Sequence, residues 1–444
     1  MTVTESPKLS TDEIVQLCRD HTIFSWSAQA KVNPIVIDHA EGIYFWDADG
    51  KRYIDFNSQL MSVNIGHGDK RVADAIAEQA HRLAFAAPQF ATEVRGRLGQ
   101  MLSELTPGDL NHFFFTLGGS EANENALRMA RMFTGRQKVM ARYRSYHGAT
   151  AGSMSVTGEP RRWASEPAVP GVIRVLDPYR WGTPDPEPVD EHLAYLEEVI
   201  NYEGPDTIAA FIMETVTGTN GILVPPDGYL QGVRELCTRY GIMLICDEVM
   251  AGFGRTGRWF AVDHWDVVPD LMTMAKGLTS SYLPLGAVAV SDRIAAHFDD
   301  NVYFGGLTYS AHPMSCAAAI AAVGVLRDDD LVGNAARLAP VMAQELAGLQ
   351  QRHPSVGTTR SIGLFGVVEL VRSRDPYVLL AGYNATPPEI AALDRRLKAD
   401  GLYTMNHWST FFTNPPLSIT EEQLREGFSI IDRALEETDA AIGG

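Results

Sequence analysis

Short apolar runs alternate with amphipathic stretches along most of the chain. From about residue 66 onward, the stretches between the runs have the spacing of helices, whereas the runs themselves are continuously apolar. Continuous apolar strands separated by helices are typical of a mostly parallel sheet that is covered on both faces. We therefore predict an α/β fold with strands at HFFFTL (112–117), KVMARY (138–143), AAFIME (209–214), IMLICD (242–247), LMTMAK (271–276) and GAVAVS (286–291).

The two ends of the chain differ from this central pattern. Residues 41–56 carry two aromatic-rich runs around the turn sequence Asp47-Ala48-Asp49-Gly50, which predicts a hairpin. From about residue 311 the chain becomes alanine-rich and helical, with strand-like pieces after it, and residues 175–190 have the proline and aspartate of a surface loop. The expected parts are an N-terminal segment (1–65) packing with a small domain, a large domain (66–310) and the C-terminal small α+β domain (311–444).

The size and charge of the chain fit this organisation and exclude some partners. A length of 444 residues exceeds one ordinary core, and 45% hydrophobic residues are ample for a packed interior. The formal net charge of −18 repels nucleic acids and anionic membranes, so we expect neither as a partner. No stretch approaches the roughly 18 apolar residues that a membrane helix requires.

The cysteines and histidines argue against disulfides and metals. Met1 to Ser10 has no apolar core of the kind that secretion needs, which favours a cytoplasmic protein. The twelve histidines show no HExxH or similar spacing, so we predict no metal site. Free thiols in a reducing compartment are expected, because no CxxC pair occurs among Cys18, Cys237, Cys246 and Cys316.

Polar residues close several of the apolar runs. Glu214, Asp247 and Lys276 each stand at the C-terminal end of a predicted strand. In open α/β sheets, ligands bind outside the carboxyl ends of the strands. These three side chains, which are distant in sequence, therefore predict one site at that edge of the sheet.

A strand, a glycine turn and a helix follow one another at residues 112–133. Gly118, Gly119 and Ser120 stand where the helix begins. Free backbone N–H groups and the helix dipole make such a position an anion site, and glycine lets a phosphate approach closely. The alternative is an ordinary helix start in which Ser120 is the N-cap.

Residues 252–257, GFGRTG, match the GxGxxG dinucleotide fingerprint, but their context does not. The fingerprint requires strand, turn and helix in immediate succession. Here the residues from Asp247 to Ala251 separate the apolar run from the first glycine, and the sequence that follows has no clean helical period. An oxidoreductase would rest on this motif alone.

Asp247 and Lys276 are candidate buried charges. A carboxylate at the end of a buried strand is costly unless a cation or a strong donor meets it. Lys276 lies in a neighbourhood poor in charge, and a partly desolvated lysine has a lowered pKa that makes it a competent amine nucleophile. The alternatives are a turn-capping aspartate, a metal ligand pair at Asp247-Glu248 and a solvated surface lysine.

One cofactor uses all of these groups. Pyridoxal phosphate needs a phosphate cradle, a Schiff-base lysine and a carboxylate for its pyridinium nitrogen. It also needs an aromatic ring to stack on, and Tyr146 in SYHGAT is the candidate, with core packing as the alternative role. The residues thus predict a pyridoxal-phosphate enzyme with Lys276 as the Schiff-base lysine.

Several motifs, in a specific order and spacing, carry a resemblance to a known family. They are GGSEANE (118–124), YHG (146–148), DEVMAGFGRTG (247–257), MAKGL (274–278) and TYSAHP (308–313). With them the chain resembles the class III aminotransferases, which act on ω-amino acids and amines, over most of its length from about Glu41 to Ile419. The resemblance implies the fold of fold-type I pyridoxal-phosphate transferases, with a mostly parallel, seven-stranded type of sheet.

The resemblance implies which residues surround the cofactor ring. Tyr146 stacks on one ring face and Val249 packs on the other. Asp247 pairs with the pyridine nitrogen, and Glu214 lies near Asp247 and the ring hydroxyl. His147, in the same motif as Tyr146, belongs to the cofactor site as well.

The resemblance also implies a phosphate site that is shared between subunits. Gly119 and Ser120 bind the phosphate, and Thr308 binds the phosphate of the neighbouring subunit. Each active site then needs a homodimer, with a tetramer as the alternative assembly.

The implied reaction is transamination in two halves. Lys276 acts as the general base at the substrate Cα, while Asp247 keeps the ring nitrogen protonated. An amine donor and a 2-oxo acid, pyruvate or 2-oxoglutarate, then react with ping-pong kinetics. A pyridoxal-phosphate lyase or aminomutase on the same scaffold is the main alternative, and a non-catalytic dimeric binding protein is a remote one.

The substrate is inferred from a missing arginine. Many relatives carry an arginine, in the segment equivalent to residues 401–420, that binds the carboxylate of the keto acid, but here that segment has none. Arg162 in TGEPRRW is the candidate replacement, with a solvated loop residue as the alternative. Trp26, Met61 and Trp408 are candidate apolar walls, although each also fits a core position. We expect a β- or ω-amino acid or taurine as the donor, with an uncharged primary amine as the alternative.

Overall fold

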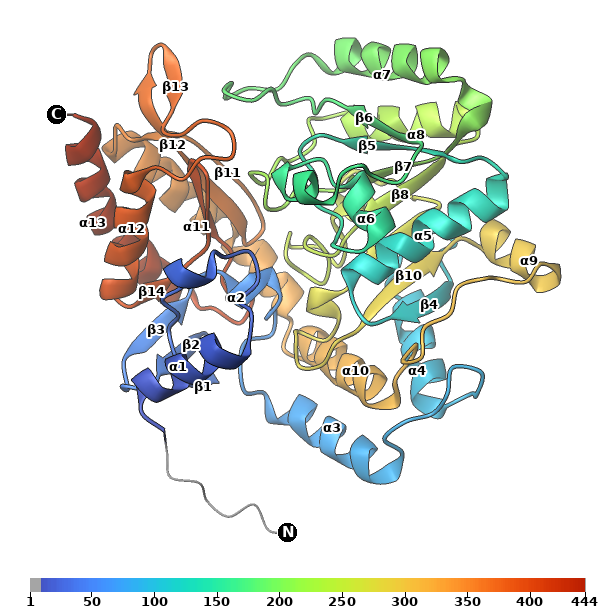
Figure 1. Ribbon diagram of the computed structural model, residues 1–444, viewed down its shortest axis with the longest axis horizontal. Coiled ribbons are helices and arrows are strands. Elements are labelled where there is room, and N and C mark those ends of the chain that lie inside the picture. The colour runs from blue at the N-terminus through green and yellow to red at the C-terminus, as the bar shows by residue number, and fades with distance from the viewer. Residues whose placement is uncertain (1–8, 444) are drawn as a thin grey trace.

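A seven-stranded sheet lies at the centre of the larger part of the molecule (Figure 1). The structure is a computed structural model that describes residues 9–443, so most of the segment Met1 to Ser10 lies outside the described residues. β10 is antiparallel to both of its neighbours, and the other strand pairs are parallel. In sheet order the strands are β4 (His112–Thr116), β10 (Gly286–Val290), β9 (Leu271–Met274), β8 (Met243–Asp247), β7 (Ile208–Glu214), β5 (Lys138–Arg142) and β6 (Val172–Val175).

This sheet confirms the predicted strands and adds one. Each of the apolar runs singled out in the sequence forms a strand, and the sheet is mostly parallel as predicted. β6 was not predicted, because its sequence VIRV is short and Arg174 interrupts the apolar pattern. The residues between β6 and α7 form no helix or strand, which confirms the predicted loop at 175–190 up to the start of that helix.

Alternate residues of the strands enter two separate cores. Ala210 and Ile212 of β7 belong to the cluster that includes α5, whereas Phe211 and Met213 belong to the cluster that includes α7 and α8. Figure 1 shows α5 and α6 in front of the sheet and α7 above it. The helices of this part are α5 (Gly119–Thr134), α6 (Ala151–Val156), α7 (Val189–Glu203), α8 (Tyr229–Tyr240) and α9 (Asp292–Asp300).

The C-terminal part contains an antiparallel sheet of its own. Its strand order is β11-β12-β16-β15, and β13 pairs with the C-terminal end of β12. The strands are β11 (Val356–Ile362), β12 (Phe365–Arg374), β13 (Tyr377–Leu379), β15 (Asn406–His407) and β16 (Thr410–Thr413). The helices beside them are α11 (Leu331–Arg352), α12 (Pro388–Ala399) and α13 (Glu421–Ile442).

The N-terminal strands form a sheet with a strand of the C-terminal part. β1 (Ile37–Glu41), β2 (Tyr44–Asp47) and β3 (Arg52–Asp55) are antiparallel, which confirms the predicted hairpin. β14 (Leu402–Tyr403) then pairs in parallel with β3, where Leu402 lies opposite Ile54. N-terminal and C-terminal segments are therefore held together by backbone hydrogen bonds.

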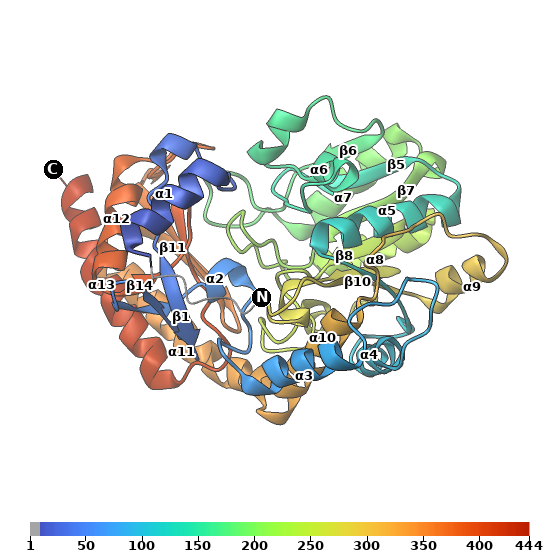
Figure 2. The ribbon, with the colours of Figure 1, turned by 60° about the horizontal axis from the view of Figure 1, so that its bottom comes forward.

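A long helix connects the two parts. α10 (Pro313–Asp328) packs against α3 (Lys70–Arg82) and α4 (Glu93–Ser103) before the chain enters the C-terminal part (Figure 2). The domain boundaries that we expect at residues 65 and 310 remain a proposal. Within residues 9–443, no helix combines the length and the apolar character needed to cross a membrane.

The buried side chain of Arg255 links the large part of the molecule to N-terminal and C-terminal segments. Its side chain is fully buried and lies in the turns that follow β8. Nη1 donates hydrogen bonds to the carbonyl oxygens of Leu364 (3.1 Å) and Pro415 (2.6 Å), and Nη2 donates to Ser58 Oγ (3.1 Å) and Asn64 Oδ1 (3.0 Å). Burial lowers the pKa of Arg255 to about 9. The GFGRTG motif thus contains a structural arginine, and turns rather than a helix follow β8, unlike a dinucleotide site.

Candidate active site

One cavity of about 400 Å³ opens at the carboxyl ends of β7, β8 and β9. The turn before α5, the loop after β5, the segment Leu60–Ser62 and Met405 complete its walls. Because parallel strands bring their carboxyl ends to the same edge, the strand-end residues meet here. The cavity brings together the predicted residues Trp26, Met61, Gly119, Ser120, Tyr146, His147, Glu214, Asp247, Val249 and Lys276.

Asp247 is held by three hydrogen bonds at the end of β8. Oδ2 accepts from Asn123 Nδ2 and from the Nδ1 of His147, both at 2.8 Å, and Oδ1 accepts from the backbone N–H of Val249 at 3.0 Å. A carboxylate only accepts, so Nδ1 of His147 carries a proton. The Asp247 side chain is therefore fixed in orientation while it lines the cavity.

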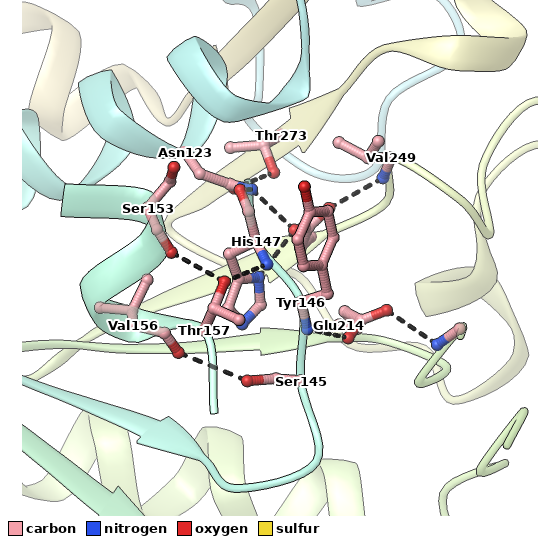
Figure 3. A network of polar contacts seen from close by, with 12 residues as sticks. Asn123, Ser145, Tyr146, His147, Ser153, Val156, Thr157, Glu214, Val249 and Thr273 are labelled. Carbon is pink, nitrogen blue, oxygen red and sulfur yellow. Dashed lines mark hydrogen bonds and ion pairs between the residues drawn. The ribbon is translucent and has the colours of Figure 1, made fainter. Parts of the chain in front are cut away.

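Asn123 and Thr273 support this arrangement, and sequence reasoning missed both. Thr273 Oγ1 donates to Asn123 Oδ1 at 2.7 Å, and Asn123 Nδ2 also donates to the carbonyl oxygen of His147 at 2.8 Å (Figure 3). One signal was present, since Thr273 is the polar residue within the apolar strand LMTM. A fully buried polar side chain in such a strand needs a specific partner.

Lys276 is half-buried and follows β9 with a strained backbone. Its φ of 38° lies in the left-handed region that favours glycine. Burial lowers the pKa of Lys276 to about 8, against the opposing charges of Asp247 and Glu214, and the positive charge of Arg161 lowers it further. Among the described residues, none accepts a hydrogen bond from Nζ. The amine is thus available for reaction in its neutral form at mildly alkaline pH.

Glu214 fixes two loops at the edge of the cavity. Oε1 accepts from the backbone N–H of Tyr146 at 3.0 Å, and Oε2 accepts from that of Gly218 at 2.7 Å (Figure 3). Burial raises the pKa of this carboxyl above its ordinary value, and neighbouring Asp247 adds to the effect. Glu214 therefore positions the loop that carries Tyr146.

Glu248, next to Asp247, is held by three hydrogen bonds within the fold. Its carboxylate accepts from Thr215 Oγ1 at 2.7 Å and from the backbone N–H groups of Ala261 and Val262 at 2.9 and 3.0 Å. Burial raises its pKa to about 7. Within residues 9–443, no three His, Cys, Asp or Glu side chains gather as a metal site would need. The Asp247-Glu248 pair is thus explained without a metal.

The turn before α5 suits a phosphate. Gly119 and Ser120 line the cavity at the N-terminus of this helix, where backbone N–H groups are free of intrahelical partners. A Cβ at Gly119 would lie 3.0 Å from the Val249 methyl groups, and one at Gly148 would lie 2.4 Å from Ser120 Oγ. Glycine is therefore favoured at both positions, because a side chain would collide with a residue of the cavity wall. Together with Lys276, these residues fit pyridoxal phosphate.

Arg161 is the cationic group of the cavity wall. Its Cζ lies 3.7 Å from the centre of the Tyr146 ring and 5.5 Å from that of Trp26, so the guanidinium lies close to both aromatic rings. Nε donates to Glu159 Oε1, and Nη2 donates to Thr219 Oγ1 at 3.0 Å. Nη1 has no partner among residues 9–443. The cavity thus offers a free cationic donor some distance from the strand-end residues.

Comparison with known proteins agrees with this geometry. The family model for aminotransferase class III matches residues 26–435. The chain belongs to the class III aminotransferases. It is 33% identical to the putrescine–pyruvate aminotransferase of Pseudomonas aeruginosa, over 97% of this chain and 98% of that protein. It is also 32% identical to a probable γ-aminobutyrate transaminase of Oryza sativa subsp. japonica, over 96% of this chain and 92% of that protein.

Solved structures of this family share the fold. The taurine:2-oxoglutarate aminotransferase from Bifidobacterium kashiwanohense, solved with pyridoxal phosphate and glutamate, superposes with a TM-score of 0.95 at 40% identity, covering 98% of this chain and 99% of that one. An (S)-enantioselective ω-transaminase from Thermomicrobium roseum gives 0.91 at 38% identity, covering 97% and 99%. The fold is thus the fold-type I architecture that the resemblance implied, and the enzyme uses pyridoxal phosphate.

Arg162 of this aminotransferase does not line the cavity, contrary to expectation. Its Nε donates to the carbonyl oxygen of Gly158 at 3.1 Å, and Nη1 pairs with Glu166. It lines a separate cavity of about 310 Å³. Both arginines lie in the 3₁₀ helix Pro160–Ser165, where successive side chains diverge by about 120°, so only Arg161 points to the active site.

Trp408 is also outside the active-site cavity of the aminotransferase. It lies in the turn between β15 and β16 and is buried against Trp181 and Tyr383, with ring centres 5.4 and 4.5 Å away. Met405 is the residue of this segment that lines the cavity. The backbone of Trp408 has a φ of 55°, and such a turn breaks the strand alternation that a sequence argument relies on.

Thr308 lies on the surface of the single subunit. Its side chain is exposed and does not line the cavity. Its role in a partner's site stays a prediction.

Proposed function

We propose that this aminotransferase transfers the amino group of a β- or ω-amino acid, or of an amino sulfonate such as taurine, to a 2-oxo acid. Pyruvate and 2-oxoglutarate are the acceptors that we expect. The observation that carries the proposal is Arg161, a free cationic donor in the wall of the cavity that also contains Lys276.

The placement of Arg161 supports a donor with an amine at one end and an acid at the other. The guanidinium is near enough to Lys276 for its charge to lower the pKa of that lysine. It lies over the Tyr146 ring, with Cζ 3.7 Å from the ring centre. Because a guanidinium binds a carboxylate or a sulfonate through paired N–H groups, Arg161 suits either acid.

We assign the proton transfer of the reaction to Lys276. When bound, pyridoxal phosphate supplies the carbonyl carbon that takes up the amino group and a ring that accepts electrons. The Lys276 amine then removes the proton at the substrate Cα and returns it, which a lysine with a lowered pKa does well near neutral pH. Donor and acceptor use the same cavity in turn, so ping-pong kinetics are expected.

The remaining cavity residues bind and orient the cofactor in this proposal. Gly119 and Ser120 hold the phosphate through the N-terminus of α5. Tyr146 and Val249 flank the ring, with Glu214 fixing the backbone of Tyr146. Asp247 pairs with the ring nitrogen, and His147 orients Asp247.

We further propose that the enzyme works as a cytoplasmic homodimer. Large aromatic side chains are exposed on two neighbouring segments, and the rings of Phe85 and Tyr309 are 6.0 Å apart. An exposed aromatic cluster of this kind marks an interaction surface. Thr308 lies next to it, which suits a residue that reaches a second subunit. The free thiols Cys18, Cys237, Cys246 and Cys316 suit a reducing compartment.

The proposed function is tested by substrate profiles of two adjacent variants. Wild-type enzyme should convert taurine, β-alanine or a longer ω-amino acid with pyruvate or 2-oxoglutarate faster than it converts 1-phenylethylamine. Arg161→Ala should raise KM for the acidic donors by about a hundredfold, because a charged hydrogen bond in a partly desolvated site is lost, and should leave KM for 1-phenylethylamine within about threefold. Arg162→Ala, the matched control, should change neither. Equal effects of Arg161→Ala on both donor types would remove the acid site from the proposal.

A further inference from the structure

We infer that Glu159 determines the substrate range of this cavity, by holding Arg161 in place and balancing its charge. The inference rests on the proposed function, since it concerns the same acid-binding site. It names a specificity-determining residue that does not itself line the cavity.

Glu159 is built into the fold as a fixed counter-ion. Its side chain is 1% exposed, and Oε1 accepts the hydrogen bond from Arg161 Nε. The residue caps the 3₁₀ helix Pro160–Ser165, and its carbonyl oxygen accepts from the backbone N–H of Arg162 at 3.1 Å. With backbone and side chain both fixed, Glu159 determines where the guanidinium of Arg161 lies.

No other carboxylate shares this task. Among residues 9–443, Glu159 is the acid that is hydrogen-bonded to Arg161. Glu214, although it lines the same cavity, is occupied by two backbone N–H groups. Asp177 accepts from the backbone N–H of Arg144 and is paired with Arg142. The charge of Arg161 in the empty cavity is therefore balanced by Glu159.

This balance allows the cavity to accept ligands with and without an acid group. An unpaired guanidinium buried under an apolar ligand is strongly unfavourable, whereas the Glu159–Arg161 pair is neutral. When a ligand brings its own acid, Arg161 Nη1 is free to bind it, although the carboxylate of Glu159 repels the incoming anion. Glu159 thus weakens the binding of acids at Arg161 and makes uncharged amines acceptable.

The decisive variant is Glu159→Gln, which removes the charge and keeps an oxygen that can accept from Arg161 Nε. The probe is ethanesulfonate, which has no amine and does not react, and its Kd for the holoenzyme is measured by calorimetry. We expect the Kd to fall about tenfold and KM for 1-phenylethylamine to rise severalfold, with kcat changed little. Glu159→Asp, which keeps the charge, should restore both values toward wild type. Glu166→Gln, at the carboxylate paired with Arg162 outside the cavity, is the matched control and should have no effect.

Arg161→Ala distinguishes the failure of this inference from that of the proposed function. If Arg161→Ala loses ethanesulfonate binding but Glu159→Gln leaves the Kd unchanged or raises it, Glu159 has no charge-balancing role. If Arg161→Ala binds ethanesulfonate like wild type, the acid site itself is wrong. Should Glu159→Gln not fold, the double variant Glu159→Gln/Arg161→Gln removes both charges. It should accept 1-phenylethylamine with a wild-type KM, and a strongly raised KM would overturn the inference.

Discussion

The active-site cavity has two halves that are built in different ways. On the cofactor side, Glu214 and Asp247 are paired in register on β7 and β8, and Asp247 is paired with Thr273 on β9. On the side where we place the substrate, Trp26 and Met405 lie in loops, Met61 ends the short helix α2 (Ser58–Met61), and Arg161 lies in the 3₁₀ helix Pro160–Ser165. Strand register fixes the relative positions of side chains to within a fraction of an ångström, whereas each loop depends on its own contacts.

Strained backbone occurs at two residues of the substrate side, in addition to Lys276 on the cofactor side. Trp26 and Met61 have φ values of 53° and 54°, in the left-handed region that residues with a Cβ seldom adopt. Strained conformations of this kind persist only where surrounding contacts impose them. For the segment around Met61, Asp55 supplies them by accepting hydrogen bonds from the backbone N–H of Gln59 and from His67. The cofactor half thus follows from topology, and the substrate half from local tertiary contacts.

The largest expected effect is on the cofactor side, at Lys276. Lys276→Ala should lower turnover by about a thousandfold or more, because the general base and the attachment point for the cofactor are lost together. Borohydride reduction of the wild-type holoenzyme, followed by peptide mapping, should find the pyridoxyl group on the Lys276 peptide. The exposed Lys31→Ala should behave as wild type. A pyridoxyl group on a different lysine would sink the assignment.

Asp247→Asn should have the next largest effect. Removing one partner of a buried ion pair costs about 3–5 kcal/mol, so turnover should fall by about a hundredfold or more. Cofactor affinity should change much less, because the turn before α5 still holds the phosphate. Turnover and the Kd for pyridoxal phosphate are measured on the same preparations. Near-normal turnover would mean that the ring nitrogen has another partner.

The pH dependence of cofactor binding tests the burial of Lys276. Because its pKa in the apoprotein is lowered from 10.5 to about 8, the neutral amine is present above pH 8. The rate constant for binding of pyridoxal phosphate to the apoprotein should reach a plateau above pH 8. Below it, the rate should fall about tenfold for each pH unit. Stability should also rise between pH 8 and 10.5, where the folded chain releases the proton before the unfolded chain does. A rate that still climbs above pH 9.5 would show a solvated lysine.

The smallest expected effect separates two of the three residues predicted as apolar walls, Met61 and Trp408. Met61 is buried and lines the cavity, so Met61→Ala should lower KM for bulky uncharged amines by about threefold to tenfold as the cavity grows. Trp408→Phe should change KM less than about twofold, because Trp408 packs on Trp181 and Tyr383 outside the cavity. Thermal unfolding of both variants serves as the control for folding. A larger change in KM for Trp408→Phe would mean that the turn between β15 and β16 contributes to substrate selection.

The strand-end residues on the cofactor side could be predicted from the sequence. There, the apolar runs that predict strands end in the polar side chains that the cofactor needs. Each apolar run marks a strand, and the polar residue that ends the run must lie at the sheet edge. Asn123 and Thr273 were not predicted. They support Asp247 through a hydrogen bond between a helix and a strand that are 150 residues apart in sequence. A single sequence contains no direct record of such a pair.

Arg161 and Arg162 show why the substrate half was harder to predict. The sequence placed a cation in the segment TGEPRRW, but two adjacent arginines differ only in direction, and a short 3₁₀ helix decides which one faces the cavity. The prediction that Trp408 lines the cavity was wrong for a similar reason. The turn at Trp408, with a φ of 55°, directs its side chain to a neighbouring aromatic cluster. Composition predicted the kind of side chain that the cavity needs, and tertiary contacts selected the residue.

Arg255 should couple the unfolding of the different parts of the chain. Its guanidinium lies in the part that contains the seven-stranded sheet, yet it donates to Ser58 and Asn64 near the N-terminus and to Leu364 and Pro415 in the C-terminal part. If either of these parts came away alone, a buried charge would lose its acceptors, at a cost of several kcal/mol. Partial opening is therefore penalised almost as heavily as complete unfolding. The molecule should melt as one cooperative unit rather than domain by domain.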